Sequence, residues 1–261
     1  LRFDGRSAHS ALSSDRAFAQ PGVRSLLEDR SGTLWIGTEH GLWRVRAGSV
    51  RAEQVVLGEP GGEAIDAIVE TLFADRQQRL WIGTSQGLGL LDEGGGRLMF
   101  YSGSPADSDS LLDPHVISIF EDRSGLIWIG TKFGGLAKWN PRSWSFGHRR
   151  PEVPPASSSR NVVSFTETAD GRLWIGTMGS GVIVSDREGK VLGTVRDSGA
   201  HGPLRDGRIM ALLTDRHDVI WAGTMDGGLE RISPQNLSVK HYRYERGNRY
   251  SLPSDGVMSL F

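Results

Sequence analysis

Leu34-Trp35-Ile36-Gly37-Thr38 is the first of five copies of one short sequence pattern. The later copies occupy residues 80–84, 127–131, 173–177 and 220–224. Their tryptophans are spaced by 46, 47, 46 and 47 residues, at Trp35, Trp81, Trp128, Trp174 and Trp221. A period of this length is typical of the blades of a β-propeller.

The surroundings of each copy predict further short strands. An apolar run precedes each tryptophan, at residues 23–27, 69–73, 116–120, 162–165 and 209–213. A second apolar run follows the glycine that comes after each motif threonine. A third run predicts a fourth strand at residues 98–101, 144–148, 191–195 and 239–242. Four antiparallel strands make one propeller blade.

These patterns predict an all-β fold, a β-propeller of four-stranded antiparallel blades with five full repeats plus partial blades. We expect residues 1–261 to form one partial propeller domain. The predicted blades lie at about 23–57, 65–101, 115–149, 161–196 and 208–244, and segments 1–22 and 245–261 are expected to belong to a further blade. Because residues 256–261 repeat the pattern of 115–120 without a tryptophan strand after them, we expect the sequence to be part of a larger protein.

Three columns of the repeat are interpreted as structural. The motif tryptophans are expected to pack between blades, and the glycine two places later to let the next sheet approach closely. Small residues recur in the first strand, as at Ser25 and Ser118, and are interpreted as packing positions near the axis. The turn aspartates, such as Asp29 and Asp122, are interpreted as turn formers and not as catalytic groups.

Composition excludes several functional classes. The chain of 261 residues has a formal net charge of -1, so we expect no nucleic-acid partner. It has no cysteine, which excludes disulfides and thiolate metal sites and leaves the compartment open. No apolar stretch is long enough for a membrane span and no signal peptide opens the sequence, so membrane contact is expected only through segments that are absent here.

The stretch Val116–Leu136 resembles the two-component regulator propeller repeat, and the resemblance extends over all five repeats. It implies a parent propeller of seven blades in the periplasmic sensor part of a bacterial membrane protein. The cytoplasmic part of such proteins is a histidine kinase or a diguanylate cyclase. Residues 134–141 and 144–146 are similar to the version found ahead of diguanylate cyclases. The resemblance therefore implies a sensor module in the periplasm.

A search for catalytic chemistry finds no motif. The seven histidines show no metal-site spacing, and neither a nucleophile elbow nor a phosphate-binding glycine loop is present. We therefore expect no catalytic residues, no metal and no cofactor, although the parent protein is expected to carry an enzymatic output domain. Two alternatives remain open, a propeller hydrolase or lyase acting on carbohydrate and a pure protein-interaction scaffold.

Ligand recognition is predicted on the loops at one end of the propeller. Loops over a rigid scaffold are the usual place for binding residues. The expected ligand is a small polar molecule or an oligosaccharide, and a homodimer is a possible further partner. The predicted ligand-binding residues are Glu39, His40, Gln86, His115, Lys132, Phe133, Asn161, Met178, Arg208, Met225 and Asp226.

Overall fold

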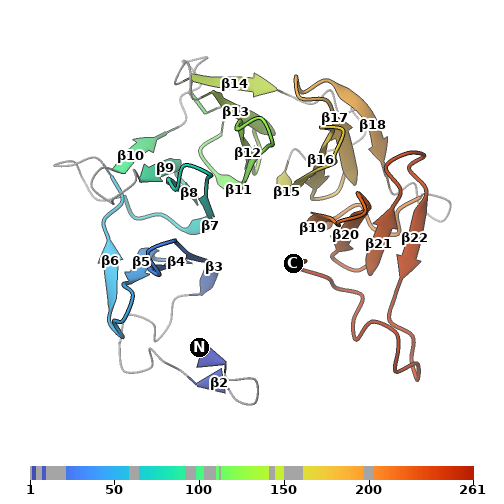
Figure 1. Cartoon of the computed structure of the whole chain (residues 1–261), viewed down its shortest axis with the longest axis horizontal. Helices are drawn as coiled ribbons and strands as arrows, with labels where there is room; N and C mark the ends of the chain where they lie inside the picture. Colours follow the sequence, from blue (N-terminus) through green and yellow to red (C-terminus); the bar gives the residue numbers. More distant parts are fainter. Residues whose placement is uncertain are drawn as a thin grey trace. The chain divides into compact units, whose positions relative to one another are not determined.

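The computed structural model describes residues 2–3, 8–9, 22–58, 65–91, 98–102, 110–111, 113–140, 145–149, 161–196 and 203–261. Strands are the only regular secondary structure among them. They form five antiparallel sheets of four strands and one of two strands (Figure 1). The described residues contain no helix that is long and apolar enough to cross a membrane.

Each four-stranded sheet is one sequence repeat, and its strands pair in the order in which they follow one another. The first two sheets contain β3 (Val23–Glu28), β4 (Leu34–Thr38), β5 (Gly41–Val45) and β6 (Ala52–Val55), and β7 (Val69–Ala74), β8 (Leu80–Thr84), β9 (Leu88–Leu91) and β10 (Leu98–Tyr101). The third contains β11 (Val116–Glu121), β12 (Ile127–Thr131), β13 (Leu136–Asn140) and β14 (Ser145–Arg149). The last two contain β15 (Val162–Glu167), β16 (Leu173–Thr177), β17 (Val182–Ser185) and β18 (Val191–Val195), and β19 (Ile209–Thr214), β20 (Ile220–Thr224), β21 (Leu229–Ile232) and β22 (Val239–Tyr242). These sheets are propeller blades, as the repeat period predicted.

The ends of the chain contain little regular structure. β1 (Arg2–Phe3) and β2 (Ala8–His9) pair only with each other in the two-stranded sheet. Most of segment 1–22 lies outside the described residues. Near the other end, the amide of Val257 donates to the carbonyl of Thr224 over 2.9 Å. The assignment of both ends to a further blade stays a prediction.

The chain separates into two compact units, which we treat one at a time. The N-terminal unit comprises Leu1–Gly103 and Pro114–Val116 and holds the first two blades. The C-terminal unit comprises Ser104–Asp113 and Ile117–Phe261 and holds nearly all of the other three. Within each unit, the first strands of successive blades pack on each other, β3 on β7 and β15 on β19. The fourth strands, such as β18 and β22, form the outer edges (Figure 1).

Every motif tryptophan is held by the turn between the first and second strands. The indole Nε1–H of Trp128 donates to Asp122 Oδ2 over 2.8 Å, while Asp122 Oδ1 accepts from two backbone amides of the turn. The same indole bond joins Trp35 to Asp29, Trp81 to Asp75 and Trp221 to Asp215. In the fourth blade the acceptor is Thr168 Oγ1, at 3.3 Å from Trp174 Nε1. The turn aspartates are therefore structural, as the sequence predicted.

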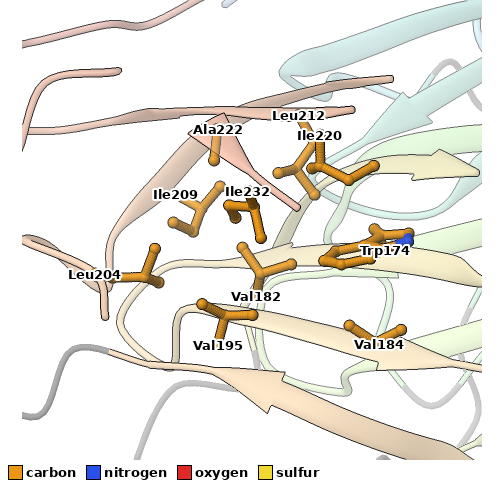
Figure 2. Close-up of a cluster of buried hydrophobic side chains, with 10 residues drawn as sticks. All are labelled: Trp174, Val182, Val184, Val195, Leu204, Ile209, Leu212, Ile220, Ala222 and Ile232. Atoms are coloured by element: carbon orange, nitrogen blue, oxygen red, sulfur yellow. The ribbon is translucent and has the colours of Figure 1, made fainter. Parts of the chain in front are cut away.

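Three of the motif tryptophans are shown to lie between blades. In the C-terminal unit, Trp174 packs with residues of its own blade, such as Val182, and with Leu212 and Ile220 of the next blade (Figure 2). Trp128 shares a cluster with Phe165 of the blade that follows it. In the N-terminal unit, Trp35 packs on the second blade in the same way. Trp35, Trp128 and Trp174 thus each join two successive sheets through apolar contact.

The motif glycine makes room for this packing. A Cβ on Gly130 would lie 2.5 Å from the carbonyl oxygen of Val162 and 2.2 Å from Ser118 Oγ. Ser118 belongs to the small-residue column of the first strand, and its hydroxyl donates to the Val162 carbonyl over 2.7 Å. Both the glycine and the small residue are needed because the next blade approaches to van der Waals contact.

Candidate ligand-binding face

The candidate site is built on the turn between the second and third strands of each blade, which we call the Thr–Gly turn. The motif threonine of each blade is buried, and its hydroxyl donates to the carbonyl of the glycine that ends the turn. These bonds measure 2.8 to 3.0 Å and join Thr38 to Gly41, Thr84 to Gly87, Thr131 to Gly135, Thr177 to Gly181 and Thr224 to Gly228. The glycine carbonyl accepts its hydrogen bond from the buried threonine hydroxyl and not from solvent, so the turn is held from inside the blade.

The backbone just before the first strand supports the same turn. The amide of the residue after the threonine donates to a carbonyl there, as from Ser85 to Ile68, from Met178 to Asn161 and from Met225 to Arg208. These bonds measure 2.9 to 3.0 Å. These bonds join the Thr–Gly turn to the approach to the first strand in these three blades.

The first two residues after the motif threonine have the same pattern of solvent exposure in every Thr–Gly turn. The residue directly after the threonine is partly buried in all five blades. The next residue, which we call the exposed turn position, is solvent-exposed in all five. That position is occupied by His40, Gln86, Phe133, Gly179 and Asp226. The repeat thus presents one variable residue per blade on a constant backbone.

Two buried aspartates clamp the turns that contain two glycines, and the sequence analysis missed them. Asp113 Oδ2 accepts from the amides of Phe133 and Gly134, the latter over 3.0 Å. Asp206 Oδ2 accepts from the amide of Asp226 over 2.9 Å. Both aspartates stand three residues before the first strand of their blade, and that shared position was the available signal. A side chain in place of Gly134 would meet the Asp113 Cβ at 2.6 Å.

In the N-terminal unit the candidate residues join a chain of charges. Arg24 Nη2 lies 2.8 Å from Glu39 Oε1, and Arg24 Nη1 lies 3.8 Å from Glu70 Oε2. His115 Nε2 lies 3.0 Å from Glu70 Oε1. Glu39 and His115 are therefore brought together through Arg24 and Glu70, which the sequence analysis did not select.

The other two candidates of this unit are exposed on their turns. Gln86 donates through its side-chain amide to the carbonyl of Asp66. His40 is exposed, and its backbone amide donates to Thr38 Oγ1 over 3.1 Å. Neither side chain needs another partner to stay in place, so both are free to contact a solute.

In the C-terminal unit the fifth blade carries a compact charged corner. Arg208 donates through Nε and Nη2 to Asp206, through Nη2 to Asp226 over 2.7 Å, and through Nη1 to Met225 Sδ. Hydrogen bonds to both carboxylates raise the pKa of Arg208. The pKa of Asp206 is lowered although burial opposes this, because hydrogen bonds from Arg208 and from backbone amides favour the carboxylate. Both shifts favour the ionised forms of Arg208 and Asp206.

Four predicted residues therefore lie together in the fourth and fifth blades. Met178 and Arg208 form an isolated antiparallel bridge, which places Met178 beside Arg208, Met225 and Asp226. Asn161 joins them through its carbonyl bond to the Met178 amide. Lys132 and Phe133 stand on the third blade, where the Lys132 ammonium lies 5.4 Å from the centroid of the Phe133 ring. Phe133 is 67% exposed.

Metal-binding geometry is absent from the part of the chain that the structure describes. No group of three or more His, Asp or Glu side chains there is arranged to hold an ion. The carboxylates of the candidate face bind guanidinium groups and backbone amides instead.

The fold and the Thr–Gly turns define the class of protein. It is an all-β propeller that exposes one variable residue on each blade. The sequence matches the family model described as two component regulator propeller at residues 18–40, 110–133 and 156–179. Three stretches of the chain are therefore similar to the two-component regulator propeller repeat. A comparison with curated proteins gave no match.

Solved structures of similar fold include extracellular domains of two component and one component systems and a lyase. The extracellular domain of a protein described as a hybrid two component system from B. thetaiotaomicron has a TM-score of 0.69 and 21% identity, over 92% of this chain and 37% of that chain. A second B. thetaiotaomicron extracellular domain, described as from a one component system, has a TM-score of 0.65 and 20% identity, over 94% and 36%. Virginiamycin B lyase from Staphylococcus aureus, in an inactive form with quinupristin, has a TM-score of 0.62 and 15% identity, over 86% and 70%. The chain thus spans little more than a third of the two extracellular domains.

Proposed function

We propose that this chain is the non-catalytic, ligand-sensing propeller module of a membrane-bound bacterial signalling protein, located in the periplasm. The observation that carries the proposal is the exposed turn position, which varies in all five blades while the bonds that hold its turn are constant. Variable side chains on a rigid framework are typical of recognition surfaces. The family of the repeats and the extracellular domains of similar fold support the signalling context.

The alternative of a carbohydrate hydrolase or lyase is disfavoured by the state of the carboxylates. A general acid needs a raised pKa and access to substrate. The pKa of Asp206 is lowered, and its carboxylate is engaged by Arg208. Burial raises the pKa of Glu230, but this side chain is fully buried and contacts His241 and the amide of Arg205. Neither group suits acid catalysis on an external substrate.

The complete coding sequence provides the first test. We expect its product to contain a membrane segment and a histidine kinase or diguanylate cyclase domain. A complete product with neither would contradict the proposal. Self-association through this module, the other way in which a sensor could signal, stays a prediction that analytical ultracentrifugation would check.

The second test uses the full-length protein with the exposed turn positions changed together. His40→Ala, Gln86→Ala, Phe133→Ala and Asp226→Ala should leave the melting temperature nearly unchanged, because surface substitutions usually alter stability by less than about 0.5 kcal/mol each. Kinase or cyclase output in cells should change. A matched control replaces Arg30, Arg123, Glu188 and Arg216, which are exposed on other turns. Equal output from wild type and both variants would contradict recognition at this face.

A further inference from the structure

The methionines of this chain are concentrated at one corner of the C-terminal unit. The sequence contains five, and four of them are Met178, Met210, Met225 and Met258. Met178 is bridged to Arg208, two residues before Met210, and the Met225 amide donates to the Arg208 carbonyl. Val257, next to Met258, donates to the carbonyl of Thr224, next to Met225. Four neighbouring segments therefore each contribute a methionine to what we call the methionine corner.

All four side chains are accessible to a solute. Met178, Met210 and Met225 are partly exposed, and Met258 is 58% exposed. Methionine is unbranched and polarizable, and it adapts its shape to different apolar partners. An accessible group of methionines is therefore a surface that can take apolar ligands of irregular outline.

The two units differ at the second position of the first strand. In β15 and β19 a β-bulge occurs at Val163 and Met210, where the register of the pairing with the second strand shifts by one residue. The corresponding β-bulge in β3 and β7 occurs at Arg24 and Glu70. A β-bulge changes the direction in which the side chain of the bulged residue points. The C-terminal unit thus presents apolar groups where the N-terminal unit presents a charge pair.

Charge at the methionine corner favours a cation. Asp206 and Asp226 surround the single guanidinium of Arg208, so the three groups carry a net negative charge. The Arg208 donors already have partners, which makes Arg208 a positioning residue and a poor receptor for an anion. The Asp226 side chain is 70% exposed and offers its second oxygen to solvent. A ligand that covers the methionines would therefore meet a carboxylate at their edge.

We propose that the methionine corner binds the apolar body of a small amphipathic cation, with Asp226 facing its positive charge. The inference rests on the proposed function, because it gives the ligand chemistry for part of the same face. It predicts recognition by apolar contact together with charge, and a neutral oligosaccharide has no charge for Asp226 to face. Met210 and Met225 are then residues that determine ligand class.

Methionine-methyl NMR on the whole chain tests the proposal, with tetraphenylphosphonium as the probe. Addition of this cation should shift the methyl signals of Met178, Met210, Met225 and Met258 in a saturable way. Met99, in β10 of the N-terminal unit, is the internal control and should not move. Tetraphenylborate has nearly the same shape and the opposite charge, and it should cause much smaller shifts.

Variants separate the apolar and the charged contributions. Asp226→Asn should weaken binding of the cation by about fivefold, in line with about 1 kcal/mol for an exposed ion pair. Met210→Gln with Met225→Gln should weaken it further, while Met99→Gln and the exposed Glu188→Gln should leave it unchanged. Each variant keeps a side chain of similar size, so the fold is retained and the melting temperature provides the check.

Three outcomes would overturn the inference. Tetraphenylborate could bind as tightly as the cation, Met99 could shift with the other methionines, or maltohexaose could shift the four signals while the cation does not. In each of these cases the proposed sensor function would stand if the exposed turn substitutions still change signal output. Loss of that output effect would instead contradict the proposed function itself.

Discussion

At the scale of single residues, the aspartate of the first turn explains why tryptophan recurs in every repeat. Its carboxylate accepts from turn amides with one oxygen and from the indole with the other, as Asp215 does for Val219 and Trp221. A buried indole N–H needs an acceptor, since leaving it unpaired costs about 1 to 3 kcal/mol. The fourth blade satisfies the same need with the Thr168 hydroxyl, so the requirement is an acceptor and not a charge.

Asp215 makes the stability of the fifth blade dependent on pH. The hydrogen bond from Trp221, with further bonds from backbone amides, lowers the pKa of Asp215 below its usual range. A lowered folded-state pKa gives stability that is present above the unfolded pKa, about 3.9, and is lost as the pH falls through the folded value. Asp215→Asn should therefore reduce the melting temperature at pH 7, and the difference from wild type should narrow below about pH 4.

Thermal melts between pH 7 and pH 3 measure this effect. The exposed Glu188→Gln serves as the control, and its melting curve should follow that of wild type throughout. A difference between Asp215→Asn and wild type that stays constant down to pH 3 would show that the carboxylate charge does not stabilise the turn.

At the scale of the element, the close approach of successive first strands governs which glycines are replaceable. Gly130 and Gly193 both lie in or beside strands, and alanine is intrinsically the better residue in such positions by about 0.5 to 1 kcal/mol. A Cβ on Gly193 would meet Leu237 at an ordinary 3.6 Å. A Cβ on Gly130 would overlap the backbone of β15. Replacement by alanine should therefore have opposite effects on the free energy of unfolding at Gly130 and at Gly193.

Gly130→Ala should lower the free energy of unfolding by about 1 to 3 kcal/mol, the usual effect of overpacking. Gly193→Ala should leave it unchanged or raise it slightly. Urea denaturation of the two variants measures both values. Equal effects at the two sites would mean that blade contact does not restrict Gly130.

The sequence predicted the elements better than it predicted the bonds between them. The strand runs at 98–101, 191–195 and 239–242 coincide with β10, β18 and β22, because each is rich in apolar, β-branched or aromatic residues. β6 was missed, since Ala52-Glu53-Gln54-Val55 has little apolar character, and β14 begins one residue later than predicted.

The candidate face shows where sequence reasoning ends. Loop position alone selected the turn residues, and the structure does place Met178, Arg208, Met225 and Asp226 together. Asp113 and Asp206 were not selected, because their role depends on a turn about 20 residues further along the chain folding back onto them. The chain of charges through Arg24 and Glu70 depends on β-bulges at these two residues, and the local sequence does not predict those bulges.

At the scale of the whole molecule, each unit has its own apolar clusters. Trp35 belongs to a cluster of the N-terminal unit, and Trp174 belongs to one of the C-terminal unit. In repeat proteins stability is approximately a sum of local repeat terms and contacts between neighbours. Damage to one cluster should therefore remain near that cluster.

Trp35→Ala should remove about 3 to 5 kcal/mol of local stability, the usual cost of emptying a large aromatic site. Amide hydrogen exchange should accelerate in β3–β10 and stay nearly unchanged in β15–β22. Trp174→Ala is the converse variant and should show the reverse distribution. Acceleration spread evenly over both groups of strands by either substitution would contradict local unfolding.

The exposed turn position has a consequence for how this protein can change over time. Its backbone amide donates to a threonine hydroxyl in the first two blades, to a buried aspartate in the third and fifth, and to a carbonyl in the fourth, and none of these bonds involves its own side chain. Selection for folding and selection for ligand identity therefore act on adjacent but separate codons. New specificities can arise at His40, Gln86, Phe133 and Asp226 without passing through misfolded intermediates, and a random library confined to these four codons should express almost uniformly while differing widely in what it binds. Gly179 is the exception, because its φ of 124° is one that other residues rarely adopt.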